Sequence, residues 1–196
     1  MLVKYYSKVK PICAIYVGKG KNVSLFSDYP NSYINSGHNY YTFSPYLNMG
    51  VGGQIIVSYS ADEYVYIYKN DSLIREKICR SNYIDRIKDY PDDKVMNLVF
   101  SGKYQIEEPK YLSLVYDKFR HRYYGKVEVK FNPQNLAESQ WSIIIMDENF
   151  DVMGEVLLKY SDFDPEVLIP SPDGVLLKRT VSETENMVLS LVKFEK

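Results

Sequence analysis

The sequence predicts an all-β protein, a partial β-propeller of about three antiparallel four-stranded blades. Short apolar runs alternate with polar turn sequences along most of the chain, which is the pattern of strands joined by tight turns. Tyrosine occurs 20 times in 196 residues and glycine only 10 times, and tyrosine favours the half-buried surface of a sheet. The strand groups recur at intervals of roughly 45–60 residues, as propeller blades do.

The first 36 residues have the least regular pattern. Apolar runs occur at 3–17 and 23–26, separated by a polar segment rich in lysine and glycine. We interpret 1–36 as a partial blade or an irregular segment.

The region 37–80 is predicted to form the first blade. Its apolar runs are separated by polar residues at 60–63 and by Lys-Asn-Asp-Ser at 69–72, which is a strong turn sequence. Three strands joined in this way make a meander. The predicted strands are 55–59, 64–68 and 73–78.

The region 105–160 repeats the pattern with four strands. Polar turns at 117–120 and 147–150 separate its apolar runs. We predict a second blade with strands at 111–116, 123–131, 141–146 and 152–158.

The region 165–196 is predicted to be an incomplete last blade with three strands. Ser-Pro-Asp-Gly at 171–174 marks a clear turn. The predicted strands are 167–169, 175–179 and 187–194. A helix is hard to place in this chain, and 81–93 is the best candidate for a short one, although Pro91 interrupts it.

Composition argues against several classes of function. The 24 basic and 25 acidic residues give a net charge of −1, so no global field attracts nucleic acid. No run approaches the roughly 18 apolar residues of a transmembrane segment. The N-terminus has no apolar signal-peptide region. We therefore expect no nucleic-acid partner, no transmembrane segment and no signal peptide in this chain.

The two cysteines, Cys13 and Cys79, both lie in apolar runs. An unpaired cysteine packs as a small hydrophobic residue, and we expect buried free thiols. Whether the two form a disulfide stays an open question, because the bonding of a single pair of cysteines cannot be deduced from sequence.

Motifs with a chemical meaning are incomplete. Asp147, Asn149 and Asp151 have the alternate spacing of a calcium-binding EF-hand loop, but Val152 and Leu158 stand where that loop needs Gly and Glu. We interpret the segment as a hairpin turn. The Gly-rich run 50–53 leads into a strand and not a helix, so it does not match a phosphate-binding loop. His38 and His121 lack the neighbours of a metal site. We predict no catalytic residue, no metal and no cofactor.

Cations and aromatic residues alternate between Lys118 and Lys130. Such a mixture can stack on sugars or bases, which makes Arg122, Tyr123 and Tyr124 the candidates for ligand binding. The alternative follows from strand geometry, because successive side chains point to opposite faces. In that interpretation Lys126, Glu128 and Lys130 form one solvent-facing side.

The segments 116–124 and 145–155 resemble a bacterial family known as domain of unknown function 4221, and 27–30 resembles another of its landmarks. The resemblance covers 25–196 and corresponds to the C-terminal half of these uncharacterised, six-bladed-propeller-like proteins of Bacteroides-type bacteria. It implies a propeller fold and a periplasmic or outer-membrane-associated location, often with a lipoprotein signal. It implies no catalytic residues. The chain departs from the family in its length and in Gly125, where an arginine is expected.

We therefore expect a non-enzymatic binding or scaffold segment of a cell-envelope protein, with a protein or a glycan as its ligand. The alternative is an envelope glycan-active enzyme, or an enzyme subunit, on a propeller scaffold. About three blades cannot close a ring, and open edges invite pairing. We expect either a homodimer that closes the ring from two halves or an upstream coding region that carries a missing N-terminal half.

Overall fold

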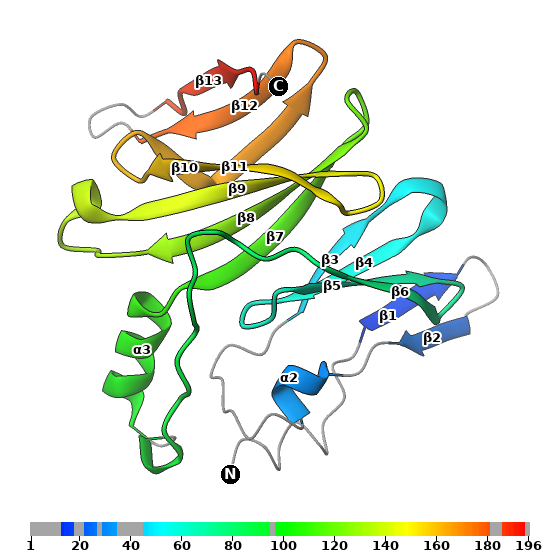
Figure 1. Cartoon of the computed structure of the whole chain (residues 1–196), viewed down its shortest axis with the longest axis horizontal. Coiled ribbons are helices and arrows are strands. Elements are labelled where there is room, and N and C mark those ends of the chain that lie inside the picture. The colour runs from blue at the N-terminus through cyan, green and yellow to red at the C-terminus, as the bar shows by residue number, and fades with distance from the viewer. Residues whose placement is uncertain are drawn as a thin grey trace.

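The computed structural model describes residues 13–17, 22–26, 29–34, 45–94, 97–180 and 186–194. Within these ranges the fold is built of antiparallel strands with few helices (Figure 1). The predicted all-β class is confirmed. The division into propeller blades stays a prediction.

Within each sheet, consecutive strands of the chain pair as antiparallel neighbours. The helices are α2 (Asn31–Ile34) and α3 (Leu98–Glu107), with single 3₁₀ turns at Val51–Gly53, Asp92–Lys94 and Leu136–Glu138. The strands are β1 (Cys13–Val17), β2 (Asn22–Phe26), β3 (Pro45–Met49), β4 (Ile55–Tyr59), β5 (Tyr64–Lys69), β6 (Ser72–Ile78), β7 (Lys110–Asp117), β8 (Arg122–Lys130), β9 (Gln140–Asp147), β10 (Val152–Lys159), β11 (Phe163–Ser171), β12 (Gly174–Arg179) and β13 (Leu189–Val192).

Three larger sheets are each a meander in which neighbours in the chain pair antiparallel. We name them sheet B (β3-β4-β5-β6), sheet C (β7-β8-β9-β10) and sheet D (β11-β12-β13), and β1 and β2 form a separate hairpin. The turn between β5 and β6 has positive φ at Asn70 (49°) and Asp71 (65°). Short polar side chains tolerate this conformation, and the turn predicted at 69–72 is confirmed.

The sheets stack in chain order, B against C and C against D (Figure 1). The first strands of the sheets are neighbours, because β7 contacts both β3 and β11. Both faces of sheet C are therefore covered. One side packs Tyr123 and Met146 against Ile56 and Ile67 of sheet B. The other packs residues such as Trp141 against sheet D.

Tyrosine rings cover the opposite face of sheet B. The Tyr29 and Tyr33 rings stack with centroids 5.8 Å apart, and Tyr59 lies 5.7 Å from Tyr33. The Tyr33 hydroxyl accepts a hydrogen bond from the backbone N–H of Ala61 (3.0 Å). A tyrosine can fill a core with its ring and satisfy a backbone group with its hydroxyl, which accounts for part of the high tyrosine content.

Three elements differ from the prediction. The helix placed at 81–93 is wrong, because this segment is irregular and only its end enters a 3₁₀ turn. The ten-residue helix α3 follows it, with Asn97 as its N-cap accepting from the Phe100 N–H (3.0 Å). Strand β3 was not predicted, since Pro45 and Asn48 are poor strand formers.

Among the described helices, none has the length and apolar character needed to cross a bilayer.

Candidate functional site

A surface cleft of about 440 Å³ lies at the end of sheet B where β4 turns into β5. We call it the rim cleft. One wall is the turn 60–63 with the start of β5, and the other is the connection from β6 to β7. Its volume falls within the range of small-molecule sites. Its lining residues are Ser32, Ala61, Asp62, Glu63, Tyr64, Arg80, Ile84, Asp85, Arg86, Ile87 and Tyr111.

Backbone hydrogen bonds hold the two walls together. The N–H of Cys79 donates to the carbonyl of Glu63 (2.7 Å), and the N–H of Tyr111 donates to the carbonyl of Ser60 (2.8 Å). The second bond joins sheet B to the first residues of β7. The cleft is therefore built on rigid strand ends, which is the position from which loops commonly present binding residues.

The connection that follows Cys79 is fastened to sheet C through Glu155. Glu155 Oε1 accepts from the hydroxyls of Ser81 and Ser142, both at 2.6 Å. Its Oε2 accepts from the N–H of Asn82, also at 2.6 Å. Hydrogen bonds to a charged acceptor are among the stronger ones in proteins, so the start of this wall is well anchored.

Asp62 is a buried carboxylate in the wall of the cleft. The residue is only 5% exposed. Oδ2 accepts from the Tyr66 hydroxyl (2.7 Å), and Oδ1 accepts from the Tyr64 N–H (3.4 Å). Burial raises the pKa of Asp62, and the hydrogen bonds from Tyr66 and Tyr64 partly oppose that rise. Burial and the neighbouring Asp62 also raise the pKa of Tyr66.

Charges of both signs surround Asp62. Arg80 Nε lies 3.1 Å from Glu63 Oε2 in a partly exposed ion pair. Asp85 and Arg86 are exposed on the same side of the cleft. The cleft thus presents carboxylates as acceptors and guanidinium groups as donors, without a strong excess of either.

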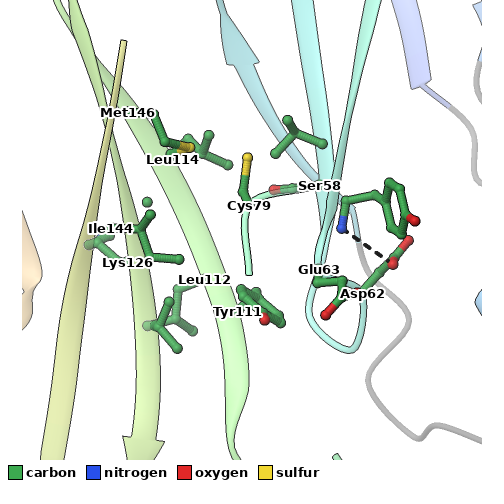
Figure 2. Close-up of a pocket in the computed structure, with 14 residues that line it drawn as sticks. Ser58, Asp62, Glu63, Cys79, Tyr111, Leu112, Leu114, Lys126, Ile144 and Met146 are labelled. Atoms are coloured by element: carbon green, nitrogen blue, oxygen red, sulfur yellow. Dashed lines mark hydrogen bonds between the residues drawn. The ribbon is translucent and has the colours of Figure 1, made fainter. Parts of the chain in front are cut away.

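A small cavity of about 20 Å³ lies beneath the rim cleft, between sheets B and C (Figure 2). It shares Asp62 and Tyr111 with the cleft and continues inward to Cys79. This volume holds only a water-sized molecule. The hydroxyl of Ser58 faces this region and has no hydrogen-bond partner among the described residues.

Cys79 is a buried free thiol, as predicted. It is 5% exposed and packs with Leu114 and Met146. Burial raises the pKa of its thiol to about 12. A thiol with so little thiolate is a poor nucleophile at neutral pH. The side chain of Cys13 lies outside the residues whose side chains are described.

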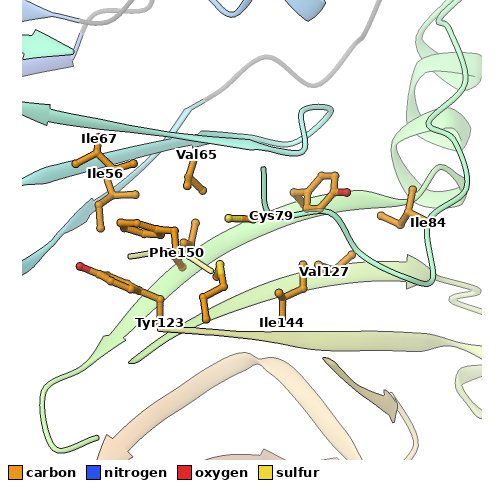
Figure 3. Close-up of a cluster of buried hydrophobic side chains, with 12 residues drawn as sticks. Ile56, Val65, Ile67, Cys79, Ile84, Tyr123, Val127, Ile144 and Phe150 are labelled. Atoms are coloured by element: carbon orange, nitrogen blue, oxygen red, sulfur yellow. The ribbon is translucent and has the colours of Figure 1, made fainter. Parts of the chain in front are cut away.

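The predicted ligand residues do not reach the rim cleft. Arg122, Tyr123 and Tyr124 begin β8, at the end of sheet C away from the cleft. Tyr123 and Tyr124 have no exposed surface and point to opposite faces. Tyr123 stacks on Phe150, with centroids 4.3 Å apart (Figure 3), and its hydroxyl accepts from the N–H of Val51 (3.3 Å). Both rings serve the core.

The prediction of one solvent-facing side on β8 is wrong. Glu128 is buried, accepts from the Tyr160 hydroxyl (2.6 Å) and forms an ion pair with Lys110. The Lys126 ammonium donates to the carbonyl of Pro165 (2.9 Å) in sheet D. Strand alternation alone does not reveal this, because a second sheet covers the polar side as well.

The predicted hairpin turn after β9 is confirmed. Asp147 Oδ1 accepts from the N–H groups of Asn149 (2.8 Å) and Asp151 (2.9 Å). These backbone N–H groups lower the pKa of Asp147. In the part of the chain that the structure describes, no three His, Cys, Asp or Glu side chains are grouped to hold a metal ion.

The signal for the cleft was present in the sequence but was not specific. Its charged residues stand directly before and after apolar runs, at 62–63 and at 80–86. Nothing in their spacing shows that the two segments meet.

Comparison with known proteins identifies the family to which this pattern belongs. The family model for domain of unknown function 4221 matches residues 17–157. A crystal structure of a member of this family from Bacteroides vulgatus matches with a TM-score of 0.70 at 15% identity. The match covers 87% of this chain and 53% of that chain, so this chain spans about half the length of that relative. None of the curated proteins matches. The resemblance inferred from 116–124 and 145–155 is confirmed.

Proposed function

Because the chain belongs to the domain of unknown function 4221 family, we propose that it is a β-propeller segment that binds a ligand and does not catalyse a reaction. Its binding site is the rim cleft. The observation that carries this proposal is that two separate segments line one cleft: the turn before β5 supplies Glu63, and the β6–β7 connection supplies Arg80, Asp85 and Arg86.

The stacking of the sheets supports the propeller part of the proposal. In a propeller, each blade is a meander whose first strand lies near the axis and whose faces pack on the next blades. Sheets B and C are four-stranded meanders, and β7 contacts both β3 and β11. The rim cleft would then lie where a turn within one blade meets the connection to the next.

We propose a glycan as the ligand. Sugar hydroxyls donate and accept hydrogen bonds together, and they match a cleft with both carboxylates and guanidinium groups. The ring faces of a sugar also pack on aromatic side chains, and the half-buried Tyr64 lines the cleft. A mixed set of charges suits such a ligand better than a polyanion.

The state of the reactive groups favours binding over catalysis. The carboxylate of Asp62 is enclosed and engaged by Tyr66 and Tyr64. Glu63 is paired with Arg80. The thiol of Cys79 is buried and protonated at neutral pH. The two buried reactive groups, Asp62 and Cys79, are therefore engaged in contacts within the fold.

One observation favours a second candidate, a glycan-active enzyme. A carboxyl group whose pKa is raised by burial can act as the acid of glycoside hydrolysis when a second carboxylate lies nearby. Burial raises the pKa of Asp62, and the adjacent Glu63 is only half-buried. In this alternative Asp62 donates the proton to the leaving group.

Isothermal titration against a panel of oligosaccharides tests the binding proposal. The panel contains hexose, N-acetylhexosamine and uronic-acid oligomers. We expect at least one to bind, and the double variant R80Q/R86Q to weaken its affinity at least 10-fold without lowering the melting temperature. The charge-matched control K69Q/K103Q changes exposed lysines outside the cleft and should bind as the parent does. Absence of binding at millimolar concentrations, or equal binding by both variants, contradicts the proposal.

Incubation with the same panel separates the binding protein from the enzyme. A binding protein leaves every oligosaccharide intact, as judged by mass spectrometry. Turnover that is lost in D62N while the titrated affinity is kept would establish the enzyme instead.

We also propose a location in the bacterial cell envelope, supported by the family resemblance alone. Fractionation of the native host, with detection by a specific antibody, tests it. Recovery in the cytoplasmic fraction contradicts this location and leaves the cleft proposal unaffected.

A further inference from the structure

A tyrosine, a histidine and a glutamate meet at the end of sheet C that lies away from the rim cleft. Tyr116 lies near the end of β7, His121 in the turn before β8, and Glu148 in the turn after β9. Glu148 Oε1 lies 2.7 Å from the Tyr116 hydroxyl oxygen and 2.9 Å from His121 Nδ1. The Tyr116 oxygen and His121 Nδ1 are 3.5 Å apart. A carboxylate oxygen, a phenol oxygen and an imidazole nitrogen therefore form a closed triangle.

Strand pairing brings the histidine and the glutamate together. Arg122 of β8 is paired in register with Asp147 of β9. His121 and Glu148 are the next residues beyond this pair, so they face each other where the two strands end. Because they are 27 positions apart in the chain, their spacing in the sequence gives no sign of this contact.

The two turns that carry His121 and Glu148 are held by their own hydrogen bonds. In the first turn, Asp117 Oδ1 accepts from the N–H groups of Phe119 (2.9 Å) and Arg120 (3.2 Å). In the second turn, the carboxylate of Asp147 accepts two backbone N–H groups in the same way. A site whose backbone is fixed before a ligand arrives loses less conformational entropy on binding.

The separations of the three atoms match those of ligands on one metal ion. Donors bound at about 2.1 Å lie about 3.0 Å apart in octahedral coordination and about 3.4 Å apart in tetrahedral coordination. The separations at this site are 2.7, 2.9 and 3.5 Å. Imidazole nitrogen and carboxylate oxygen are both common ligands of transition metals. The third donor is a phenol, so the group differs in kind from a cluster of three His, Cys, Asp or Glu side chains.

The group is open to solvent, so an ion can reach it. The side chain of His121 is 67% exposed, and that of Glu148 is 39% exposed. The hydrogen bond from Tyr116, and after it the contact with His121, lower the pKa of Glu148. Glu148 is therefore ionised at neutral pH, and its negative charge favours a cation at this position.

We propose that Tyr116, His121 and Glu148 form a binding site for a divalent transition-metal ion, with Cu²⁺ bound more tightly than Zn²⁺. The order follows from the general rise in affinity along the first-row metals to Cu²⁺ and the fall at Zn²⁺. A set with an imidazole nitrogen suits Mg²⁺ and Ca²⁺ less, because these ions prefer oxygen ligands alone. The site is independent of the rim cleft and of the ligand proposed for it.

Calorimetric titration of the tag-free chain with CuCl₂ and with ZnCl₂ tests the proposal. We expect one ion per chain, tighter binding of Cu²⁺ than of Zn²⁺, and no competition from an excess of Mg²⁺. H121Q and E148Q should each weaken Cu²⁺ binding at least 10-fold. The matched control is H38Q, which removes the other histidine of the chain and should bind Cu²⁺ as the parent does.

Two spectra give readouts besides affinity. When the phenol oxygen of Tyr116 binds Cu²⁺, it releases its proton to solvent, and charge transfer from phenolate to copper gives a visible absorption band that Y116F lacks. In NMR spectra, the paramagnetic Cu²⁺ should broaden the amide signals of 116–122 and 147–151 and leave those of 60–63 at the rim cleft sharp.

Four outcomes overturn the proposal. The first is a parent that binds no Cu²⁺ at micromolar concentrations. The second is an equal loss of affinity in H121Q and H38Q, which shows adventitious binding to histidine. The others are a Y116F variant that keeps both the affinity and the visible band of the parent, and a broadening of amide signals that is not centred on the two turns.

Discussion

The guanidinium of Arg120 joins a fully buried carboxylate to a neighbouring sheet. Arg120 Nε lies 2.7 Å from Asp117 Oδ2, and its Nη2 donates to the carbonyls of Ser171 (2.9 Å) and Gly174 (2.7 Å). Asp117 has no exposed surface and also accepts from the Tyr124 hydroxyl (3.1 Å). One side chain thus connects the β7–β8 turn of sheet C with the β11–β12 turn of sheet D.

Replacing Arg120 by methionine should destabilise the protein by about 3–5 kcal/mol, because it leaves the buried Asp117 without its cation. Urea unfolding monitored by the fluorescence of Trp141 measures this. The control is K103M, which removes an exposed partner 3.7 Å from Glu107 and should cost about 0.5 kcal/mol or less. Equal effects of the two substitutions would show that Arg120 is not a link between the sheets.

Two glycines on strands should respond differently to alanine. At Gly174 an added Cβ would lie 2.6 Å from the carbonyl oxygen of Val192, so the β12–β13 pairing must shift, and we expect a loss of about 1–3 kcal/mol. At Gly125 it would lie 3.2 Å from the flexible end of Met146, and we expect stability within about 1 kcal/mol of the parent. Thermal unfolding of both variants compares them. A G125A variant less stable than G174A contradicts the described packing.

The buried Asp62 should make the protein less stable as the pH rises. Its folded-state pKa lies above the ordinary value of 3.8, so the unfolded chain ionises first. The contribution of Asp62 is therefore fully present below pH 3.8 and is lost as the pH rises through the raised pKa. The free energy of unfolding of the parent, measured relative to D62N in urea at each pH from 3 to 7, should fall with pH.

A second variant tests the cause of that pH dependence. The hydroxyl of Tyr66 donates to Asp62 and lowers its pKa. Y66F removes this bond, so the pKa should rise further and the loss of stability should extend to higher pH. If the free energy of unfolding of the parent instead rises relative to that of D62N as the pH increases, Asp62 is stabilised in its charged form and the prediction is wrong.

Local sequence patterns predicted most strands because strands and turns depend on nearby residues. The turn at 69–72 is an example, since Asn70 and Asp71 adopt the positive φ that their side chains tolerate. Helix α3 was not predicted, because its apolar residues do not follow the periodicity of an amphipathic helix. Leu98 and Val99 are exposed, and Gly102 lies inside the helix. Its N-cap, Asn97, was the one signal that could have indicated it.

The candidate site was not predictable for a different reason. Tyr123 and Tyr124 stood out as an aromatic pair among cations, but sheets on both sides bury them. The rim cleft depends on two segments meeting, one at 62–63 and one at 80–86. Their meeting follows from hydrogen bonds such as Tyr111 N–H to Ser60, between residues 51 positions apart in the numbering of the chain.

The sequence by itself determined that the chain forms short antiparallel strands, where most of its tight turns lie, and to which family it belongs. These properties depend on local backbone preference and on alternation within a few residues. Only the tertiary structure decided which sheet faces are covered, that Glu128 and Asp117 are buried with partners, and that the charged segments at 62–63 and 80–86 share a cleft. Such properties depend on contacts between distant residues, and no local pattern encodes them.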